Sequence, residues 1–369
     1  MTTGIIKLSH FSVKEYLLST RIEEYFSINE KTSHLKILEF SIAYLLQFDD
    51  DSLPLTEAKL DSMPLVQYVA EHWISHAKSG EMVPTVLSLI LCLFTSGSVP
   101  LTNWIRMYNI DARGCKDLSM DKAEVCSALY YSSLTGMLEV SEYLLHSKGE
   151  NANAEGGRLG NALQAASYKG YEVIVKLLLE NGAEVNSKGG EYGNALQAAA
   201  ASYQNNEVIV KLLLENGAEV NAKGGKYGNA LQAASYIGKK AIMKLLLENG
   251  AEVNAEGRIY GNALCAAVES YQCDEVIVKL LLENGAEVDA GRGMYGNALQ
   301  TASHRGHEGI VKLLLENGAE VDAGRGMYGN ALQTASHEGH EGIVKLLLEN
   351  GAEVDAGGGM YGKIGRAHV

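Results

Sequence analysis

The residues best suited to chemistry in this chain are two histidine pairs near its C-terminal end. His304 and His307 are three positions apart, and His337 and His340 repeat that spacing. Two imidazoles so spaced can share a metal ion, but a stable site needs further ligands that converge on it. The loops around both pairs supply no thiolate or added carboxylate pair at ligand spacing. We therefore interpret these histidines as structural and expect no metal.

A second group of reactive residue types lies near the N-terminus. His10, Ser12 and Glu15 are the types found in a hydrolytic triad, but no Gly-x-Ser-x-Gly turn surrounds the serine. We expect His10 to pack at a junction between a strand and a helix instead. The chain also lacks the GxxxxGK[ST] phosphate loop. These observations predict neither enzymatic activity nor a bound cofactor.

The charge and the cysteine content exclude further classes of protein. The 369-residue chain carries a net charge of −14. An acidic chain lacks the basic face that nucleic acids and anionic membranes require, so neither is an expected partner. The five cysteines form no CxxC pair, which favours a reducing, cytoplasmic location. The apolar run VLSLILCLF (Val86–Phe94) is too short to span a bilayer and predicts a buried helix.

An internal repeat predicts the elements that position these side chains. The phrase KLLLENGAE occurs six times, and YGNAL or its variant LGNAL recurs in steps of 33 or 35 residues from Gly160 to Gly329. Each unit predicts a short helix of small residues, a second, more apolar helix and a projecting β-turn that we call the finger. The Asn of NAL can cap the first helix, and the Gly of ENGAE predicts a left-handed C-cap after the second.

Two repeats are longer by two residues, at Ala198–Glu207 and Ala266–Glu275. The extra residues fall at the junction between the two helices of the unit. There, Asn205-Asn206 and Cys273-Asp274 replace a glycine turn. Because Asn and Asp tolerate positive φ better than most residues, we expect these junctions to use that conformation.

The stretch NALQAASYIGKKAIMKLLLENGAEVNA (Asn229–Ala255) resembles the ankyrin repeat, which has the same period. It departs from the family pattern in having Asn-Ala-Leu-Gln for Thr-Pro-Leu-His and Glu for Asp in Gly-Ala-Asp-Val. The resemblance covers residues 124–362. It implies an all-α ankyrin-repeat solenoid of about seven repeats that binds other proteins, with a degenerate first repeat at Ser127–Ala154 as its cap.

Residues 1–123 lack this period. Gly4–Thr20 predicts a short strand followed by an amphipathic helix. Further helices are predicted at Ser33–Phe48 and Met63–Ala77 from apolar spacings of three and four. Pro64 suits the first turn of the last of these helices.

Two phrases in this region resemble part of fungal NLR-like receptors that contain a NACHT domain. KLSHFSVKEYLLS (Lys7–Ser19) is similar to the end of their winged-helix segment, of the GPI inositol-deacylase-like type, and YVAEHWISHA (Tyr68–Ala77) is similar to the following helical linker. The resemblance implies a winged-helix end at 1–30, a linker at 31–123, and a sensor or adaptor role at the end of a larger receptor. The nucleotide-binding NACHT domain itself is missing from this chain, so the alternative is a free-standing ankyrin adaptor.

The last residues break the repeat. After Tyr361-Gly362 the pattern predicts Asn-Ala-Leu-Gln, but the chain reads KIGRAHV. Ile364–Val369 back-translates to a common sequencing-library adapter. We interpret residues 363–369 as an artefact and expect the true protein to continue.

The repeats differ mainly at the finger tips and helix junctions, which line the concave binding groove of ankyrin proteins. Tyr, Arg and Met suit a protein interface, and neutral drift at exposed sites is an equally good explanation. The recurring finger tyrosines, such as Tyr192 and Tyr227, favour an aromatic ladder between fingers over ligand contact. The candidate partner-binding residues are Lys188, Glu191, Lys223, Lys226, Arg258, Ile259, Arg292, Met294, Arg325, Met327, Tyr168, Tyr203, Tyr236, Tyr271, His304, Arg305 and His337.

Overall fold

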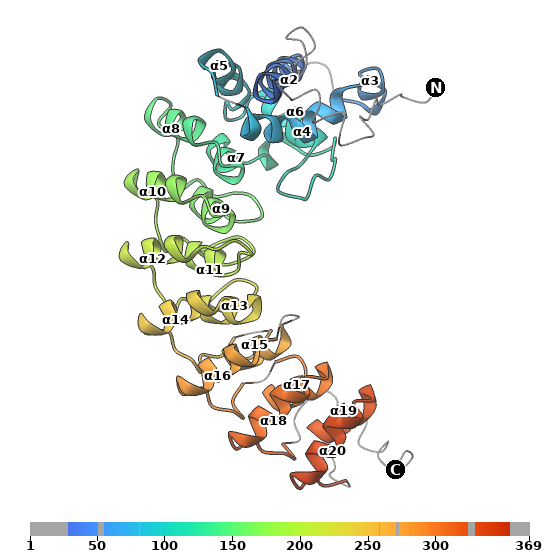
Figure 1. The fold of residues 1–369 in the computed structure, drawn as a ribbon. Helices are drawn as coiled ribbons and strands as arrows, with labels where there is room; N and C mark the ends of the chain where they lie inside the picture. Colours follow the sequence, from blue (N-terminus) through green and yellow to red (C-terminus); the bar gives the residue numbers. More distant parts are fainter. Residues whose placement is uncertain are drawn as a thin grey trace, which may run out of the picture. The chain divides into compact units, whose positions relative to one another are not determined.

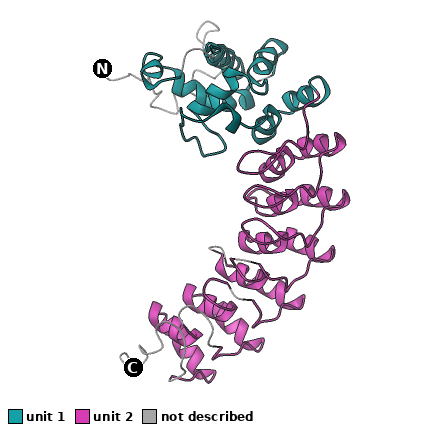
Figure 2. Ribbon diagram, turned by 180° about the vertical axis from the view of Figure 1, so that it is seen from behind, with its two compact units in different colours: residues 1–148 teal, residues 149–369 magenta. Residues whose placement is uncertain are grey.

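The computed structural model describes residues 29–50, 55–80, 82–257, 259–270, 273–291, 293–323 and 329–354. Within these ranges the regular structure is helical, and strand pairing is limited to isolated bridges. The chain divides into two compact units, residues 1–148 and residues 149–369 (Figure 2). Each unit has a buried apolar core of its own.

The first unit is a group of helices around an aromatic core. Trp73, Phe94 and Trp104 are almost fully buried, and their ring centroids lie 5.1 to 6.0 Å apart. The indole N–H of Trp104 donates to the carbonyl of Ala70 at 3.0 Å. Without this bond the buried N–H would have no hydrogen-bond acceptor. The described helices are α2 (Glu30–Leu45), α3 (Glu57–Asp61), α4 (Val66–Ser79), α5 (Pro84–Leu93), α6 (Val99–Met107), η1 (Lys122–Glu124), α7 (Ala128–Thr135) and α8 (Leu138–His146).

Helices α2 and α4 match the two helices predicted from apolar spacing, and they pack against each other. The apolar run predicted as a buried helix forms α5, which buries Ile90 and Leu93. No helix in the described ranges is long and apolar enough to cross a membrane. The prediction for Pro64 is wrong, because α4 begins at Val66 after an N-cap at Leu65 and the proline precedes the helix.

Some sequence predictions fall on residues that the structure does not describe. These include the strand and helix at Gly4–Thr20, the Lys7–Ser19 phrase and the tail at 363–369. The degenerate first repeat is present as α7 and α8, with Gly136 at φ 80° ending α7, and this pair groups with the first unit. The boundaries at residues 30 and 123 stay predictions.

The second unit is a row of helix pairs (Figure 1), in which each inner helix packs against the next inner helix and against its own outer helix. This arrangement follows from the sequence, because alanines line the inner helices and allow close approach. The inner helices are α9 (Ala162–Lys169), α11 (Ala195–Ala200), α13 (Ala230–Ile237), α15 (Ala263–Glu269), α17 (Ala298–Arg305) and α19 (Ala331–Glu338). The outer helices are α10 (Glu172–Glu180), α12 (Glu207–Glu215), α14 (Lys240–Glu248), α16 (Glu275–Glu283), α18 (Glu308–Glu316) and α20 (Glu341–Glu349).

Both predicted caps are confirmed. The side chain of Asn229 accepts the backbone N–H of Gln232 at 2.8 Å, which satisfies a free donor at the start of α13. Gly217 follows α12 with φ 84°, a left-handed conformation that strains any residue with a Cβ. The same two caps recur in the other repeats of this unit, so one helix–cap–turn unit is stacked repeatedly.

The predicted positive φ is not found at the four junction residues Asn205, Asn206, Cys273 and Asp274 of the longer repeats. Asn206 has φ −102° and Asp274 has φ −113°, and in the described part of the chain Arg113 is the only non-glycine residue with positive φ. Buried Asn206 instead donates its side-chain amide to the carbonyl of Ser167 in the preceding repeat at 2.8 Å. Asp274 caps α16 by accepting the N–H of Val276 at 2.9 Å. Side-chain hydrogen bonds therefore fix these junctions.

Candidate protein-binding surface

Each finger is the segment between an outer helix and the next inner helix, and neighbouring fingers are joined through their backbones. Gly189 N–H donates to the Gly193 carbonyl at 2.8 Å, which closes one finger. Glu191 N–H donates to the Arg158 carbonyl, and Lys226 N–H donates to the Glu191 carbonyl, both at 2.8 Å. We number finger 1 (149–161), finger 2 (182–194), finger 3 (217–229), finger 4 (250–262) and finger 5 (285–297). Fingers 1 to 3 thus form one hydrogen-bonded surface.

The predicted aromatic ladder is present in fingers 2 to 4. The ring centroid of Tyr227 lies 6.1 Å from that of Tyr192 and 5.7 Å from that of Tyr260, and both pairs are stacked. Tyr192 and Tyr227 are buried. Burial is the main cause that raises the pKa of both hydroxyls, so each remains a neutral hydrogen-bond donor. Tyr328 lies outside the described residues.

Two of the junction tyrosines extend this ladder. The ring of Tyr168 stacks on Tyr192 at 4.8 Å, and that of Tyr236 lies 5.2 Å from Tyr227 and 4.7 Å from Tyr260. These rings connect the inner helices to the fingers. Tyr203 differs, because it is 74% exposed in the loop of a longer repeat. Of these three tyrosines it offers by far the most free surface.

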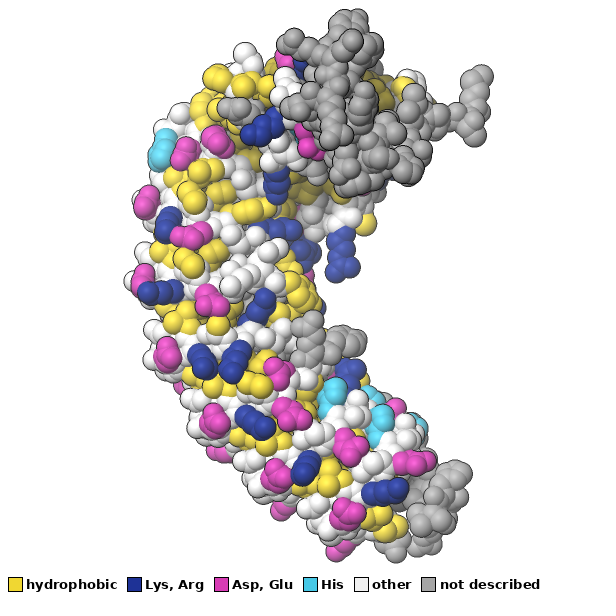
Figure 3. Space-filling model, viewed as in Figure 1, with side chains coloured by type: hydrophobic (Ala, Val, Ile, Leu, Met, Phe, Trp, Pro, Cys, Tyr) yellow, Lys and Arg dark blue, Asp and Glu magenta, His cyan; other side chains and the backbone are white. Residues whose placement is uncertain are grey.

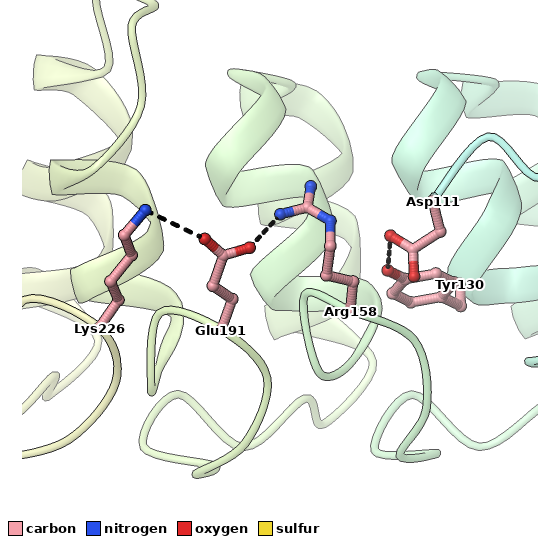
Figure 4. Close-up of polar contacts among 5 residues, drawn as sticks. All are labelled: Asp111, Tyr130, Arg158, Glu191 and Lys226. Atoms are coloured by element: carbon pink, nitrogen blue, oxygen red, sulfur yellow. Dashed lines mark hydrogen bonds and ion pairs between the residues drawn. The ribbon is translucent and has the colours of Figure 1, made fainter. Parts of the chain in front are cut away.

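An ion-pair chain joins fingers 1 to 3 (Figure 4). The carboxylate of Glu191 pairs with the Arg158 guanidinium, and its Oε1 lies 3.6 Å from Lys226 Nζ. The Lys226 ammonium also lies 5.6 Å from the centroid of the Tyr227 ring. The negative charge of Glu191 is therefore balanced by cations of the neighbouring fingers. Figure 4 also draws a buried contact inside the first unit, in which the Tyr130 hydroxyl donates to Asp111 at 2.7 Å.

Sequence reasoning missed the glutamine of NALQ, which anchors the next finger. Gln197 Nε2 donates to the carbonyls of Ala222 at 2.8 Å and Gly228 at 3.3 Å, at the two ends of the turn of finger 3. The departure from Thr-Pro-Leu-His therefore has a structural function. The sequence pattern could have indicated this role, because Gln recurs at this position in every copy except one, where Cys265 replaces it.

The Asn of EVNA links successive fingers at their base. Asn186 donates to the Gly217 carbonyl at 2.9 Å and accepts the Glu219 N–H at 2.9 Å. Three later copies have Asp instead, and Asp289 accepts the Glu320 N–H at 3.1 Å. A carboxylate cannot donate, so the Asn-to-Asp change keeps one of the two links.

The C-terminal histidines pack at the junction between two repeats. The His304 ring stacks on Tyr295 with centroids 4.0 Å apart, and His304 Nδ1 lies 3.2 Å from a carboxylate oxygen of Glu338. His340 Nε2 lies 3.2 Å from the His304 carbonyl. Among the residues that the structure describes, no group of His, Cys, Asp and Glu could hold a metal ion.

The candidate residues differ in how far they are exposed. The exposed ones are Lys188, Lys223, Lys226, Tyr203, Ile259, Met294 and His337. The half-buried ones pack within the repeats, and they are Tyr168, Glu191, Tyr236, His304 and Arg305. Those outside the described residues are Arg258, Tyr271, Arg292, Arg325 and Met327, and the same holds for His10, Ser12 and Glu15 of the N-terminal group.

A stack of helix pairs with projecting turns defines a repeat protein, and the chain belongs to the ankyrin-repeat family. The family model for ankyrin repeats, in three copies, matches residues 89–189, 196–292 and 263–357. The solved human ASB11 ankyrin repeat domain is similar, with 28% identity and a TM-score of 0.52 over 62% of this chain and 99% of that one.

A curated relative is also similar to part of the chain. It is the azaphilone pigments biosynthesis cluster protein L of Monascus ruber, which is 34% identical over 190 residues. The match covers 47% of this chain and 40% of that protein, so the chain spans less than half of its relative.

Proposed function

We propose that the chain is a protein-recognition module that binds its partner on the finger side of the repeats. The observation that carries this proposal is that exposed apolar side chains occupy positions whose residue type changes from repeat to repeat. Tyr203, Ile259 and Met294 are exposed on the fingers and junctions, and none of them is required by the repeat. Stacked repeats present extended surfaces of this kind to their binding partners. Ankyrin repeats are typically non-enzymatic scaffolds, and no catalytic role is proposed.

We further infer that this module is the sensor or adaptor end of an NLR-like receptor in the cytoplasm. The resemblance of Lys7–Ser19 and Tyr68–Ala77 to the receptor segments supports this context. The second candidate is a free-standing ankyrin adaptor without a nucleotide switch. Sequencing the genomic locus upstream of Met1 separates the two, because an in-frame phosphate loop supports the receptor and its absence supports the adaptor.

Affinity capture from an extract of the source cells tests the recognition surface. The Tyr203→Ala/Met294→Ala variant removes two side chains that are 74% and 60% exposed, so the fold is unaffected. We expect at least about tenfold weaker capture of the partner, since exposed aromatic and Met side chains commonly dominate interfaces. The matched control is Val173→Ala/Val208→Ala on the outer helices, where the side chains are 57% and 55% exposed. Loss of the partner in the control, and not in the finger variant, would overturn the proposal.

A further inference from the structure

Exposed lysines lie on the middle fingers of a chain whose net charge is −14. Lys188 and Lys223 occupy equivalent positions in fingers 2 and 3, and both are exposed. Neither has a carboxylate partner among the residues described. The same position is Glu155 in finger 1 and Glu256 in finger 4. Along the stack this position therefore reads acidic, basic, basic, acidic.

Further cations and tyrosines surround these two lysines. Lys226 in finger 3 shares its carboxylate neighbour, Glu191, with Arg158, so positive charge remains in excess there. Lys239 Nζ donates to the carbonyl of Tyr203 at 2.9 Å, which places its ammonium group beside that exposed loop. We define the Lys–Tyr patch as Lys188, Lys223, Lys226, Lys239, Tyr203 and Tyr236.

The patch is continuous across two repeats. The Lys226 ammonium and the Tyr236 ring lie 5.6 Å and 5.2 Å from the centroid of the Tyr227 ring in finger 3. The hydrogen bond from Lys239 to the Tyr203 carbonyl places the Tyr203 loop beside the end of α13. In Figure 3, magenta carboxylates and dark blue cations are interspersed along the outer helices. The lysines of the patch without a carboxylate partner attract an anionic ligand to the finger side.

We propose that the Lys–Tyr patch binds a short acidic segment of the partner polypeptide. This proposal rests on the recognition function proposed above and gives its partner a chemical class. The lysine ammonium groups pair with Asp or Glu carboxylates, and Tyr203, which is mostly exposed, covers the apolar part of the segment. Glu155 and Glu256 bound the patch at both ends, so the acidic segment spans about two repeats.

The same features argue against a nucleic acid as the ligand. Proteins that bind single-stranded nucleic acids stack the bases on open aromatic rings. In the patch only Tyr203 is mostly exposed, whereas the ladder rings are already stacked on one another, with interplanar angles of 16° for Tyr168 and Tyr192 and 6° for Tyr192 and Tyr227. A long polyanion would also meet the carboxylates of the flanking fingers. A short acidic peptide meets neither obstacle.

Fluorescence anisotropy with the full chain tests the proposal. The probe is a fluorescein-labelled decapeptide of alternating Glu and Gly, and the reference peptide has Gln in place of Glu. We expect the Glu peptide to bind at least about tenfold more tightly at low salt, where surface attraction is little screened. The Lys188→Glu/Lys223→Glu variant should bind it about tenfold less tightly, because two attractions become repulsions.

The matched control is Lys211→Glu/Lys244→Glu, which makes the same charge change at exposed sites on the outer helices of the same two repeats. This control should bind the Glu peptide within about twofold of the unchanged chain, since these sites lie away from the patch. Equal loss in both variants, no preference for the Glu peptide, or equally tight binding of fluorescein-labelled oligo-dT would each overturn the proposal. The chain could show no preference for the Glu peptide while the Tyr203→Ala/Met294→Ala variant still captures less of its partner. That result would support protein recognition on the finger side and contradict an acidic partner segment.

Discussion

At the residue scale, one side chain per repeat determines where a finger lies. Gln197 projects from an inner helix and holds two carbonyls of the following finger, 25 and 31 residues further along the chain. Local sequence reasoning identified the caps, because their partners lie within four residues. It could not assign the glutamine, because its partners become neighbours only after the finger has folded back.

We predict that Gln197→Ala lowers the free energy of unfolding by about 1–2 kcal/mol, because the half-buried Ala222 carbonyl loses its side-chain donor and the Gly228 carbonyl keeps only the Gly224 N–H. Urea unfolding followed by circular dichroism measures this change. The control is Gln204→Ala, since Gln204 is exposed in a loop of the same repeat, and we expect its effect to stay within about 0.5 kcal/mol. Equal stability of the two variants would show that the glutamine does not anchor the finger.

At the scale of elements, every described helix in the second unit begins close to where the repeat pattern places it. The pattern succeeds because capping and apolar periodicity are local properties. It failed at the longer junctions, since Asn206 is fixed by the Ser167 carbonyl of another repeat. It also did not show that Tyr168 and Tyr236 pack on finger rings, because that depends on how the finger folds over the inner helix.

The junction between α17–α18 and α19–α20 should weaken in acid. Burial is the main cause that lowers the pKa of His304 and of His307, and the charges of Arg305 and His340 lower both further. The Glu269 carboxylate opposes the shift at both histidines, and the Glu338 carboxylate opposes it at His304. Because the pKa is lower in the folded chain, the unfolded chain binds protons more readily near its normal pKa of 6.5. The stability of these helices is therefore full above about pH 6.5 and decreases as the pH falls below it.

Hydrogen exchange with mass spectrometry measures this, after correction for intrinsic rates. Between pH 7.5 and pH 5.5 we expect α17 to α20 to open more readily, while α10 to α14 change little, since residues 149–303 contain no histidine. The His304→Asn/His307→Asn variant should flatten the dependence. A pH effect of equal size in both groups of helices would contradict the assignment to these histidines.

At the scale of the whole molecule, the repeats separate packing from recognition. The residues that recur in each copy form caps, core and finger anchors, and those that change lie mainly at the fingers and junctions. The sequence alone could locate this division but could not rank the changing residues. The structure shows that Glu191 and Lys226 pair within the fingers, whereas Tyr203 and Met294 are mostly exposed. Partner contact by any of these residues stays a prediction.

Site-specific photo-crosslinking tests whether the partner lies on the finger side of the repeats. A benzophenone amino acid is placed at Tyr203 in one version of the full chain and at Val173, on the outer helix α10, in another. Both positions are exposed, so both report on neighbours without disturbing the core. We predict a partner adduct from position 203 and none from position 173. An adduct from position 173 alone would contradict recognition through the finger side.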